Sequence, residues 1–166
     1  MQREALVPGT TDEEEIVRLM DTYSGMLLGV CTVMLSDWSL AQDVVQEVFL
    51  RAWKKRGEYH RETEKAWLMK VAVNLCHDYH RSRWYRHLDR RITPEDVPCA
   101  VPPAFDSDIL RLVRQLPMKE KETVMLFYWQ GMSAEEIAAF MDTSRSAVYR
   151  RLEKAKKLLK LELEGG

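Results

Sequence analysis

Apolar residues return every three or four positions along most of this chain, and no segment alternates with the two-residue period of a strand. A period near 3.6 residues indicates amphipathic helices, each with one buried face. The first part of the chain holds three such segments, from Asp12 to about Met34, at about 39–55 and at about 64–88. Thr11 or Asp12 is suited to cap the first of them and Thr63 the third. The pattern predicts an all-α protein.

The expected buried faces follow from the same spacing. In the first helix they comprise Ile16, Leu19, Met20, Tyr23, Leu27, Val30, Cys31 and Met34. In the second they comprise Leu40, Val44, Val45, Val48, Phe49, Ala52 and Trp53. In the third they comprise Trp67, Leu68, Val71, Ala72, Leu75 and Tyr79.

The last third of the chain predicts four further helices. One begins at Asp106 or Ser107 and is broken at Leu116-Pro117, and the others lie near 118–130, 133–141 and 144–161. Residues 133–136 read Ser-Ala-Glu-Glu, which is a capping box, and Gly131 just before it suits the positive φ that ends a helix. A short capped helix, a tight turn and a longer helix together predict a helix-turn-helix.

The final helix has two distinct faces. Val148, Leu152, Ala155 and Leu159 form one buried stripe, and Ser144 is suited to cap its start. The opposite face is basic and lies near the helix start, where a recognition helix meets base edges. The residues expected to contact duplex DNA in this region are Ser133, Arg145, Ser146, Tyr149, Arg150 and Lys154. A solvated charged face is the alternative interpretation of the same pattern.

Four of the six prolines fall within residues 89–105, which favours an extended linker. We therefore expect a loose tail at 1–10, one small helical domain at 11–88 and a helix-turn-helix domain at 106–162. The charge pattern follows this division. Residues 1–50 carry nine acidic and two basic residues, whereas 51–91 carry twelve basic and five acidic, and 143–160 carry seven basic and one acidic. Two basic blocks in a chain of net charge −1 indicate nucleic acid on two separate surfaces.

Several other classes of protein are disfavoured. No secretory signal opens the chain and no stretch approaches 18 uninterrupted apolar residues, so a cytoplasmic protein without membrane insertion is expected. Three scattered cysteines argue against a disulfide framework. Cys76 and His80 could form half of a metal site, but no second half is evident, so neither a metal nor another cofactor is expected. Without a phosphate loop, nucleophile elbow or carboxylate pair, an enzyme is not expected.

Three segments, in order, resemble an extracytoplasmic-function sigma factor (ECF, group 4), the smallest class of bacterial RNA polymerase specificity subunits. Residues 43–53 (DVVQEVFLRAW) are similar to the family's polymerase-binding helix, and 66–75 (AWLMKVAVNL) with Asp78, Tyr79 and Arg81 are similar to its −10-reading helix. Residues 116–152 resemble its −35-reading domain. The resemblance covers nearly the whole chain and implies a factor that binds core polymerase, reads and melts the −10 element and reads the −35 element.

The resemblance also implies a role for each surface. The residues implied in core-polymerase binding are Asp43, Val45, Gln46, Glu47, Phe49, Leu50 and Arg51. Those implied in −10 recognition are Tyr59, His60, Arg61, Trp67, Lys70, Asn74, His77, Asp78, Arg81 and Arg83. Aromatic rings and polar groups are the chemistry that an unstacked base requires. For Phe49 and Trp67, plain core packing remains the alternative.

The implied partners are core polymerase, through its β′ coiled coil and β flap, promoter DNA and an anti-sigma factor. Met141-Asp142-Thr143 departs from the family's usual turn, so the backbone there is expected to differ. Tyr149 and Arg150 also depart from the commonest residues, which leaves the −35 sequence open. The competing hypothesis is a conventional helix-turn-helix regulator whose N-terminal helices bind a ligand or form a dimer. It does not explain the second basic block.

Overall fold

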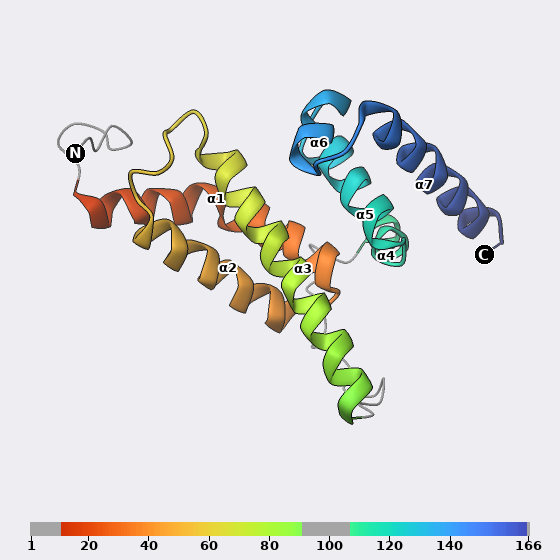
Figure 1. Ribbon diagram of the computed structural model, residues 1–166, viewed down its shortest axis with the longest axis horizontal. Coiled ribbons are helices and arrows are strands. Elements are labelled where there is room, and N and C mark those ends of the chain that lie inside the picture. Colours follow the sequence, from red (N-terminus) through yellow and green to blue (C-terminus); the bar gives the residue numbers. More distant parts are fainter. Residues whose placement is uncertain (1–10, 91–106, 166) are drawn as a thin grey trace. The chain divides into compact units, whose positions relative to one another are not determined.

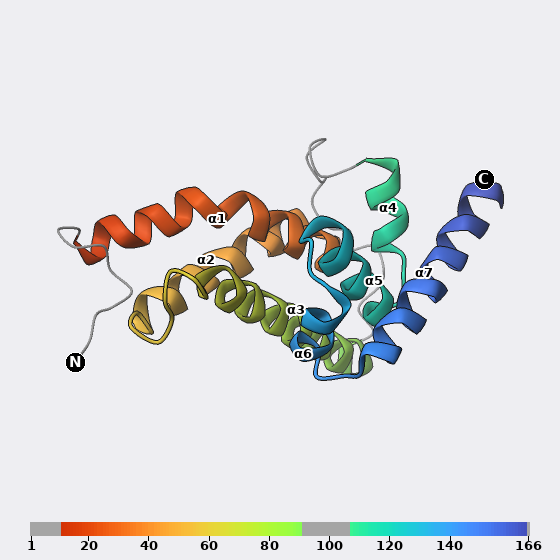
Figure 2. The same cartoon turned by 90° about the horizontal axis from the view of Figure 1, so that it is seen from above.

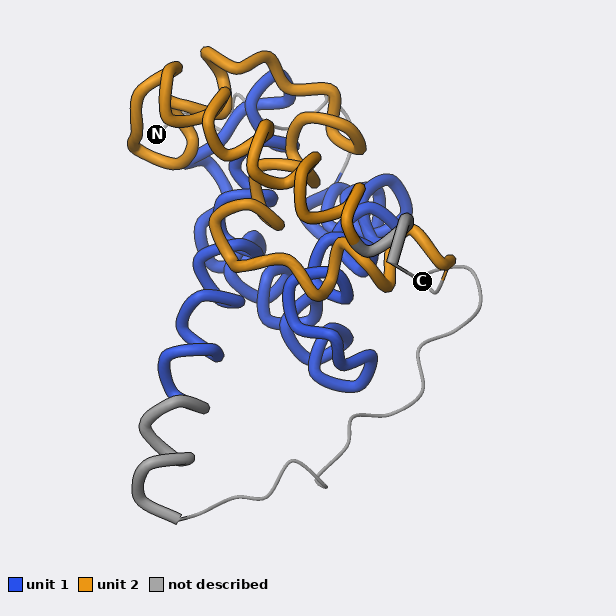
Figure 3. The backbone as a smooth tube through the Cα atoms, turned by 90° about the vertical axis from the view of Figure 1, so that its right-hand side faces the viewer, with its two compact units in different colours: residues 1–101 blue, residues 102–166 orange. Residues whose placement is uncertain are grey.

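The computed structural model describes residues 11–90 and 107–165, with side chains for 11–82 and 107–161. The expected tail 1–10, all but the first two residues of the expected linker 89–105, and the side chain of Arg83 lie outside this description. The chain divides into two compact units, residues 1–101 and 102–166, coloured separately in Figure 3. Every element within the described ranges is a helix, as the apolar spacing predicted.

The N-terminal unit consists of three helices: α1 (Asp12–Leu35), α2 (Trp38–Lys54) and α3 (Glu64–Arg90). α1 and α2 lie side by side in opposite directions, and α3 packs across both (Figures 1 and 2). Thr11 caps α1 by accepting a hydrogen bond from the Glu14 amide, and Asp37 caps α2 in the same way through the Leu40 amide. The tight reversal between them is possible because Ser36 adopts a left-handed backbone with φ 54°.

The core of this unit contains most of the apolar residues that the pattern predicted, including Leu27, Val44 and Leu68, which are fully buried. Two predictions were wrong, because Met20 is 43% and Tyr79 38% exposed. On α3 the buried set is instead wider and includes three residues outside the predicted face: Met69, Val73 and Cys76. The reason is that α3 contacts two helices at once, so a single helical stripe underestimates its buried arc.

By length and composition, α1 is the one helix within the described ranges that could cross a membrane. A core helix passes the same test. The buried side chains of α1, such as Leu19 and Leu27, lie in the core that it forms with α2 and α3.

The C-terminal unit contains α4 (Asp108–Arg114), α5 (Met118–Val124), a π-helical turn (Met125–Trp129), α6 (Ala134–Phe140) and α7 (Arg145–Gly165). Ser107 caps α4, as one of the two predicted candidates. α5 and α6 both pack on α7. The stripe predicted for α7 is confirmed at Val148, Leu152 and Ala155, which are buried.

The continuous helix expected near 118–130 is interrupted. After α5 the backbone widens into the π-helical turn, in which the Gln130 amide donates to the Met125 carbonyl five residues back, at 3.2 Å. The turn ends at Gly131, whose φ is 64°, as the sequence predicted. Such widened turns occur mostly as single turns within helices, and apolar periodicity does not mark them.

The turn between α6 and α7 uses a left-handed aspartate. Asp142 has φ 52°, and the Thr143 amide donates to the Ala138 carbonyl at 2.9 Å, which is the hydrogen bond of a Schellman motif. Glycine is the usual residue at such a position, and aspartate is one of the few others that tolerate it. The unusual residue therefore accommodates a standard helix end.

Candidate nucleic-acid and protein interfaces

The outward face of α2 mixes charge with one exposed apolar residue. Asp43, Gln46 and Arg51 are exposed, and Leu50 is 49% exposed. Glu47 is half-buried and accepts a hydrogen bond from Arg51 at 3.2 Å. This ion pair joins two partly exposed side chains, so it contributes little to stability and either partner can turn to another charge.

Val45 and Phe49, on the same helix, do not belong to this face. Both are only 6% exposed and pack in the core of the N-terminal unit. For Phe49 the structure therefore agrees with the core-packing alternative. Their side chains face the core and do not reach a partner. They affect a partner contact only by fixing the orientation of α2.

The loop between α2 and α3 (residues 55–63, the α2–α3 loop) is anchored by a tyrosine. Tyr59 is 6% exposed, and its hydroxyl donates to the Ala52 carbonyl at 3.0 Å. Its ring lies 4.7 Å from that of Trp67, centroid to centroid, and burial raises the pKa of its hydroxyl. Tyr59 is thus a hydrogen-bonded anchor and has no free face on which a base could stack. Trp67 is half-buried.

The tip of the α2–α3 loop is exposed at His60 and Arg61. The His60 amide donates to the Thr63 hydroxyl at 3.0 Å, and the Thr63 amide donates back to the His60 carbonyl, also at 3.0 Å. These two bonds close a tight turn directly before α3. The loop therefore presents an imidazole and a guanidinium from a defined backbone.

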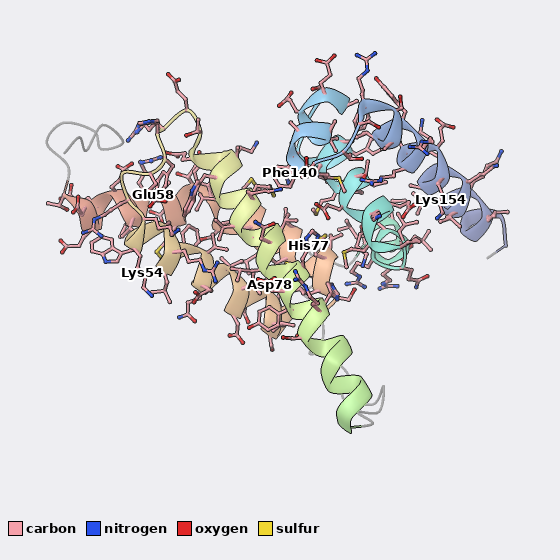
Figure 4. All side chains as sticks on the ribbon, viewed as in Figure 1. Lys54, Glu58, His77, Asp78, Phe140 and Lys154 are labelled. Carbon is pink, nitrogen blue, oxygen red and sulfur yellow. The ribbon has the colours of Figure 1, made fainter. Side chains whose placement is uncertain are left out.

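Four exposed polar residues of α3 lie on one side of the helix. Lys70, Asn74, Asp78 and Arg81 are three or four positions apart, which places them in a row, and all are exposed. His77 is half-buried beside them, and Figure 4 shows His77 and Asp78 farther along α3 from the loop. Asp78 and Arg81 form an ion pair at 3.1 Å in which both side chains are more than 60% exposed. The row offers amide and cationic donors to a nucleic-acid strand.

The helix-turn-helix presents its polar residues at the start of α7. Ser146, Tyr149 and Arg150 are exposed, and Arg145 donates to Glu135 of α6 at 2.8 Å. Lys154, labelled in Figure 4, lies 3.3 Å from Glu120 of α5. Because the Arg145 and Lys154 side chains are about 60% exposed, both cations can reach a phosphate.

Ser133 has a structural task of its own. Its hydroxyl accepts a hydrogen bond from the Glu136 amide at 3.1 Å, and the Glu136 carboxylate accepts one from the Ser133 amide at 3.3 Å. The predicted capping box is therefore confirmed. One lone pair of the hydroxyl oxygen is used by α6, and the hydroxyl hydrogen can donate to a phosphate oxygen.

Sequence reasoning missed a group of charged residues behind the α2–α3 loop. Arg18 of α1 donates to both carboxylate oxygens of Glu64, at 2.7 and 3.0 Å, and also to Glu15. Hydrogen bonds to Glu64 and then to Glu15 raise the pKa of Arg18 above its usual range. Burial, followed by hydrogen bonding to Glu64, raises the pKa of Tyr23 to about 12. The one signal in the sequence was the three-residue spacing of Asp12, Glu15 and Arg18 along α1.

Cys76 and His80 do not point to a metal site. Cys76 is fully buried, and His80 lies 2.7 Å from the Met34 carbonyl near the end of α1. Within the parts of the chain that the structure describes, no three His, Cys, Asp or Glu side chains are grouped so as to hold a metal ion.

Comparisons with known proteins assign both units. Residues 19–86 match the family described as sigma-70 region 2, and residues 106–159 match the family described as sigma-70, region 4.

Relatives match over most of the chain. RNA polymerase sigma factor CarQ of Myxococcus xanthus is 35% identical over 88% of this chain and 90% of its own length. ECF RNA polymerase sigma factor SigL of Mycobacterium tuberculosis is 31% identical over 88% and 87%. The probable RNA polymerase sigma factor RfaY of Xanthomonas campestris pv. campestris is 24% identical over 88% of this chain, which spans only 40% of that relative's length.

Solved structures share the fold. The sigma factor RpoE of Bartonella quintana, in complex with the anti-sigma factor NepR, has a TM-score of 0.77 at 20% identity, covering 91% of this chain and 98% of that one. CnrH, in complex with the cytosolic domain of CnrY, has a TM-score of 0.66 at 20% identity, covering 95% and 91%. At this identity the likeness is one of fold alone.

Proposed function

The chain belongs to the extracytoplasmic-function RNA polymerase sigma factors. We propose which of its surfaces bind core polymerase, the −10 element and the −35 element. A sigma factor binds core polymerase and directs it to promoters. The observation that carries this function is the order of the two matches, region 2 on the first helical unit and region 4 on the second. The competing hypothesis of a ligand-binding or dimerising N-terminal module is not favoured, since region 2 occupies that part of the chain.

Core polymerase binds the outward face of α2 in this proposal. Asp43, Gln46, Glu47 and Arg51 supply polar contacts, and Leu50 supplies an apolar one. An exposed leucine bordered by polar side chains fits an interface with an apolar centre and a polar rim. The β′ coiled coil is the expected partner of this face, and the β flap is expected to contact the C-terminal unit.

The α2–α3 loop and the α3 row read the −10 element. His60 and Arg61 at the loop tip, with the half-buried Trp67 and the amide of Asn74, offer the polar and aromatic groups that a flipped base requires. Lys70, His77, Asp78 and Arg81 continue along α3, where the basic members neutralise phosphates. Tyr59 contributes indirectly, because its hydrogen bond to the Ala52 carbonyl anchors the loop to α2.

The exposed start of α7 reads the −35 element. An arginine that contacts guanine in bidentate fashion contributes roughly 1–3 kcal/mol of discrimination, and Arg150 has the exposure this needs. Arg145 and Lys154 bind phosphates and so set the register without reading sequence. The hydroxyl groups of Ser146 and Tyr149 are available for either task.

The relatives also suggest a regulator and a compartment. RpoE and CnrH were solved with an anti-sigma factor and with the cytosolic domain of CnrY, respectively. We propose an anti-sigma factor for this chain too, covering surfaces that otherwise bind polymerase. A protein that acts on RNA polymerase works in the cytoplasm, and it acts there as a specificity subunit without catalytic chemistry of its own.

Run-off transcription tests this assignment. Purified core polymerase is supplied with a genomic fragment library, with and without the protein, and the start sites are sequenced. We expect new start sites behind one shared pair of spaced elements. Start sites that do not change on addition, together with a duplex shifted by the protein alone, would favour the conventional regulator.

Two variants separate the surfaces. Glu47→Lys should weaken binding to core polymerase, whereas Asp21→Lys, on an exposed position of α1, should not. Arg150→Ala should leave binding to core polymerase unchanged and reduce −35 discrimination by the bidentate contribution given above. Lys156→Ala is its matched control, because Lys156 lies on another side of α7 and is paired with Glu153 at 3.6 Å.

A further inference from the structure

Three ion pairs connect the first turns of α1 to the α2–α3 loop and its junction with α3. Asp12 lies 3.1 Å from Arg56, Glu15 lies 3.6 Å from Arg61, and Arg18 lies 2.7 Å from Glu64. Asp12, Glu15 and Arg18 are three residues apart, so they share one face of α1. Their partners occur in chain order along the loop, one near its beginning, one at its exposed tip and one at the first residue of α3. We call Asp12, Glu15 and Arg18 the α1 brace.

The middle of this contact is buried and geometrically specific. Glu15 is 7% and Glu64 3% exposed, and Arg18 holds Glu64 through two parallel N–H···O bonds. A bidentate pair fixes orientation as well as distance. Removing one member of a buried group of charges leaves the others uncompensated, so the remaining residues must move.

Other contacts hold the loop on its inner side. The guanidinium of Arg56 lies 4.2 Å from the centroid of the Trp53 ring and donates to the Trp53 carbonyl at 2.6 Å. Tyr59 is anchored to the end of α2, as described above. Inner contacts fix the base of the loop, whereas at the tip the Arg61 guanidinium forms an ion pair with Glu15 at 3.6 Å.

We propose that the α1 brace positions the α2–α3 loop for capture of the −10 base, with Arg18 as the central positioning residue. The inference deepens the proposed function and rests on it. The brace precedes residues 19–86, which match sigma-70 region 2, so it assigns a role in promoter reading to residues ahead of that match. None of the three brace residues contacts DNA in this proposal. They act through Arg61 and through the start of α3.

The test uses reconstituted holoenzyme and the promoter that the wild-type protein selects. The variants are Arg18→Gln and Glu15→Gln. Glu13→Gln is the matched control, because Glu13 is an exposed carboxylate of the same helical turn that faces away from the loop. Three quantities are measured: the affinity for core polymerase, the rate of open-complex formation, and the ratio of that rate between the natural −10 sequence and single-base substitutions within it.

For Arg18→Gln we expect the −10 discrimination ratio to fall about tenfold, because small displacements of a positioned group cost factors of this size or larger. Affinity for core polymerase should stay within about twofold of wild type, since α2 keeps its surface. A template that is already open across the −10 element should restore most of the rate. Glu13→Gln should match wild type in all three measurements.

Two results would overturn the inference. One is an unchanged discrimination ratio in Arg18→Gln, because the brace would then not matter for reading the −10 element. The other is an equal loss of affinity for core polymerase and of rate on every template in a variant that keeps its wild-type helical content by circular dichroism, because Arg18 would then support the whole unit and not the loop.

Should Arg18→Gln fail to fold, Asp12→Asn provides the same test. The pair of Asp12 and Arg56 is more exposed, so a smaller loss of discrimination, about twofold, is expected. An unchanged ratio in that variant would overturn the inference. Wild-type protein that directs no start sites would overturn the proposed function and this inference with it. That result differs from one in which wild type and variant both direct start sites with the same −10 discrimination, which would overturn the inference alone.

Discussion

Replacing Ser133 with alanine should loosen the start of the helix-turn-helix without changing its charge. The hydroxyl oxygen of Ser133 accepts a hydrogen bond from the Glu136 amide at 3.1 Å, and alanine has no acceptor to replace it. Helix α6 has only seven residues, so one lost cap affects a large part of it. Loss of a serine cap typically costs about 1 kcal/mol, which corresponds to roughly fivefold faster exchange of amides that open with α6.

Hydrogen exchange followed by mass spectrometry measures this change in peptides that cover residues 133–141. Ser133→Asp keeps an acceptor and adds a negative charge at the positive end of the helix, so it should retain wild-type protection or exceed it. Ser146→Ala is the matched control, because Ser146 is an exposed serine of α7 that caps no helix. It should leave protection of α6 unchanged.

An uncharged capping residue separates capping from DNA binding, because the carboxylate of Ser133→Asp would itself repel DNA phosphates. If Ser133→Asn restores protection but not affinity for the −35 element, the hydroxyl of Ser133 also contacts DNA. Unchanged exchange of α6 in Ser133→Ala would refute the capping argument, because the box would then contribute nothing to the stability of the helix.

Three further predictions follow from single residues. Asp142→Val should destabilise the C-terminal unit by about 1–2 kcal/mol, because a β-branched residue is strained at φ 52°, and a melting temperature equal to wild type would contradict this. Tyr59→Phe should lower the free energy of unfolding by about 1 kcal/mol, because the hydrogen bond to the Ala52 carbonyl is lost, and it should retain −10 discrimination. Loss of discrimination without loss of stability would show that the hydroxyl itself reads DNA. The pKa of Tyr23 is raised from 10.0 to about 12, so the folded state favours the neutral phenol. The stability that this preference contributes is fully present below pH 10 and is lost as pH rises to 12. Urea denaturation at pH 8 and pH 11 should therefore show a smaller alkaline loss in Tyr23→Phe, and equal losses in the two proteins would contradict the shift.

Local signals in the sequence predicted the helices and their ends well. The sequence predicts the cap at Ser133 and the left-handed Gly131 outright, and it offers Thr11 and Ser107 each as one of two candidate caps. Each depends on hydrogen bonds between residues three or four apart, or on the conformational freedom of one residue. Such features depend only on residues close together in the sequence, so they can be predicted without knowing which elements pack against them.

The candidate site was predicted less completely. The resemblance implies a −10 contact for Tyr59, whose ring is buried and whose hydroxyl is bonded to the Ala52 carbonyl of α2. It also implies a docking contact for Val45 and Phe49, with core packing as the alternative for Phe49, and both side chains lie in the core. In both cases residue type and local position allowed two environments. Only the packing of neighbouring helices selects one of them.

The helical composition, the division into two parts, the helix-turn-helix and the resemblance to a sigma factor can all be predicted from the amino-acid order, because they depend on short-range periodicity and on motifs of adjacent residues. The tertiary structure decided which side chains remain exposed and which residues meet across the chain. Arg18 and Glu64 are 46 positions apart, and their pairing exists only because α1, α2 and α3 pack so that the start of α1 lies behind the loop. No spacing rule within a single helix encodes such a contact, since it arises from the packing of whole helices.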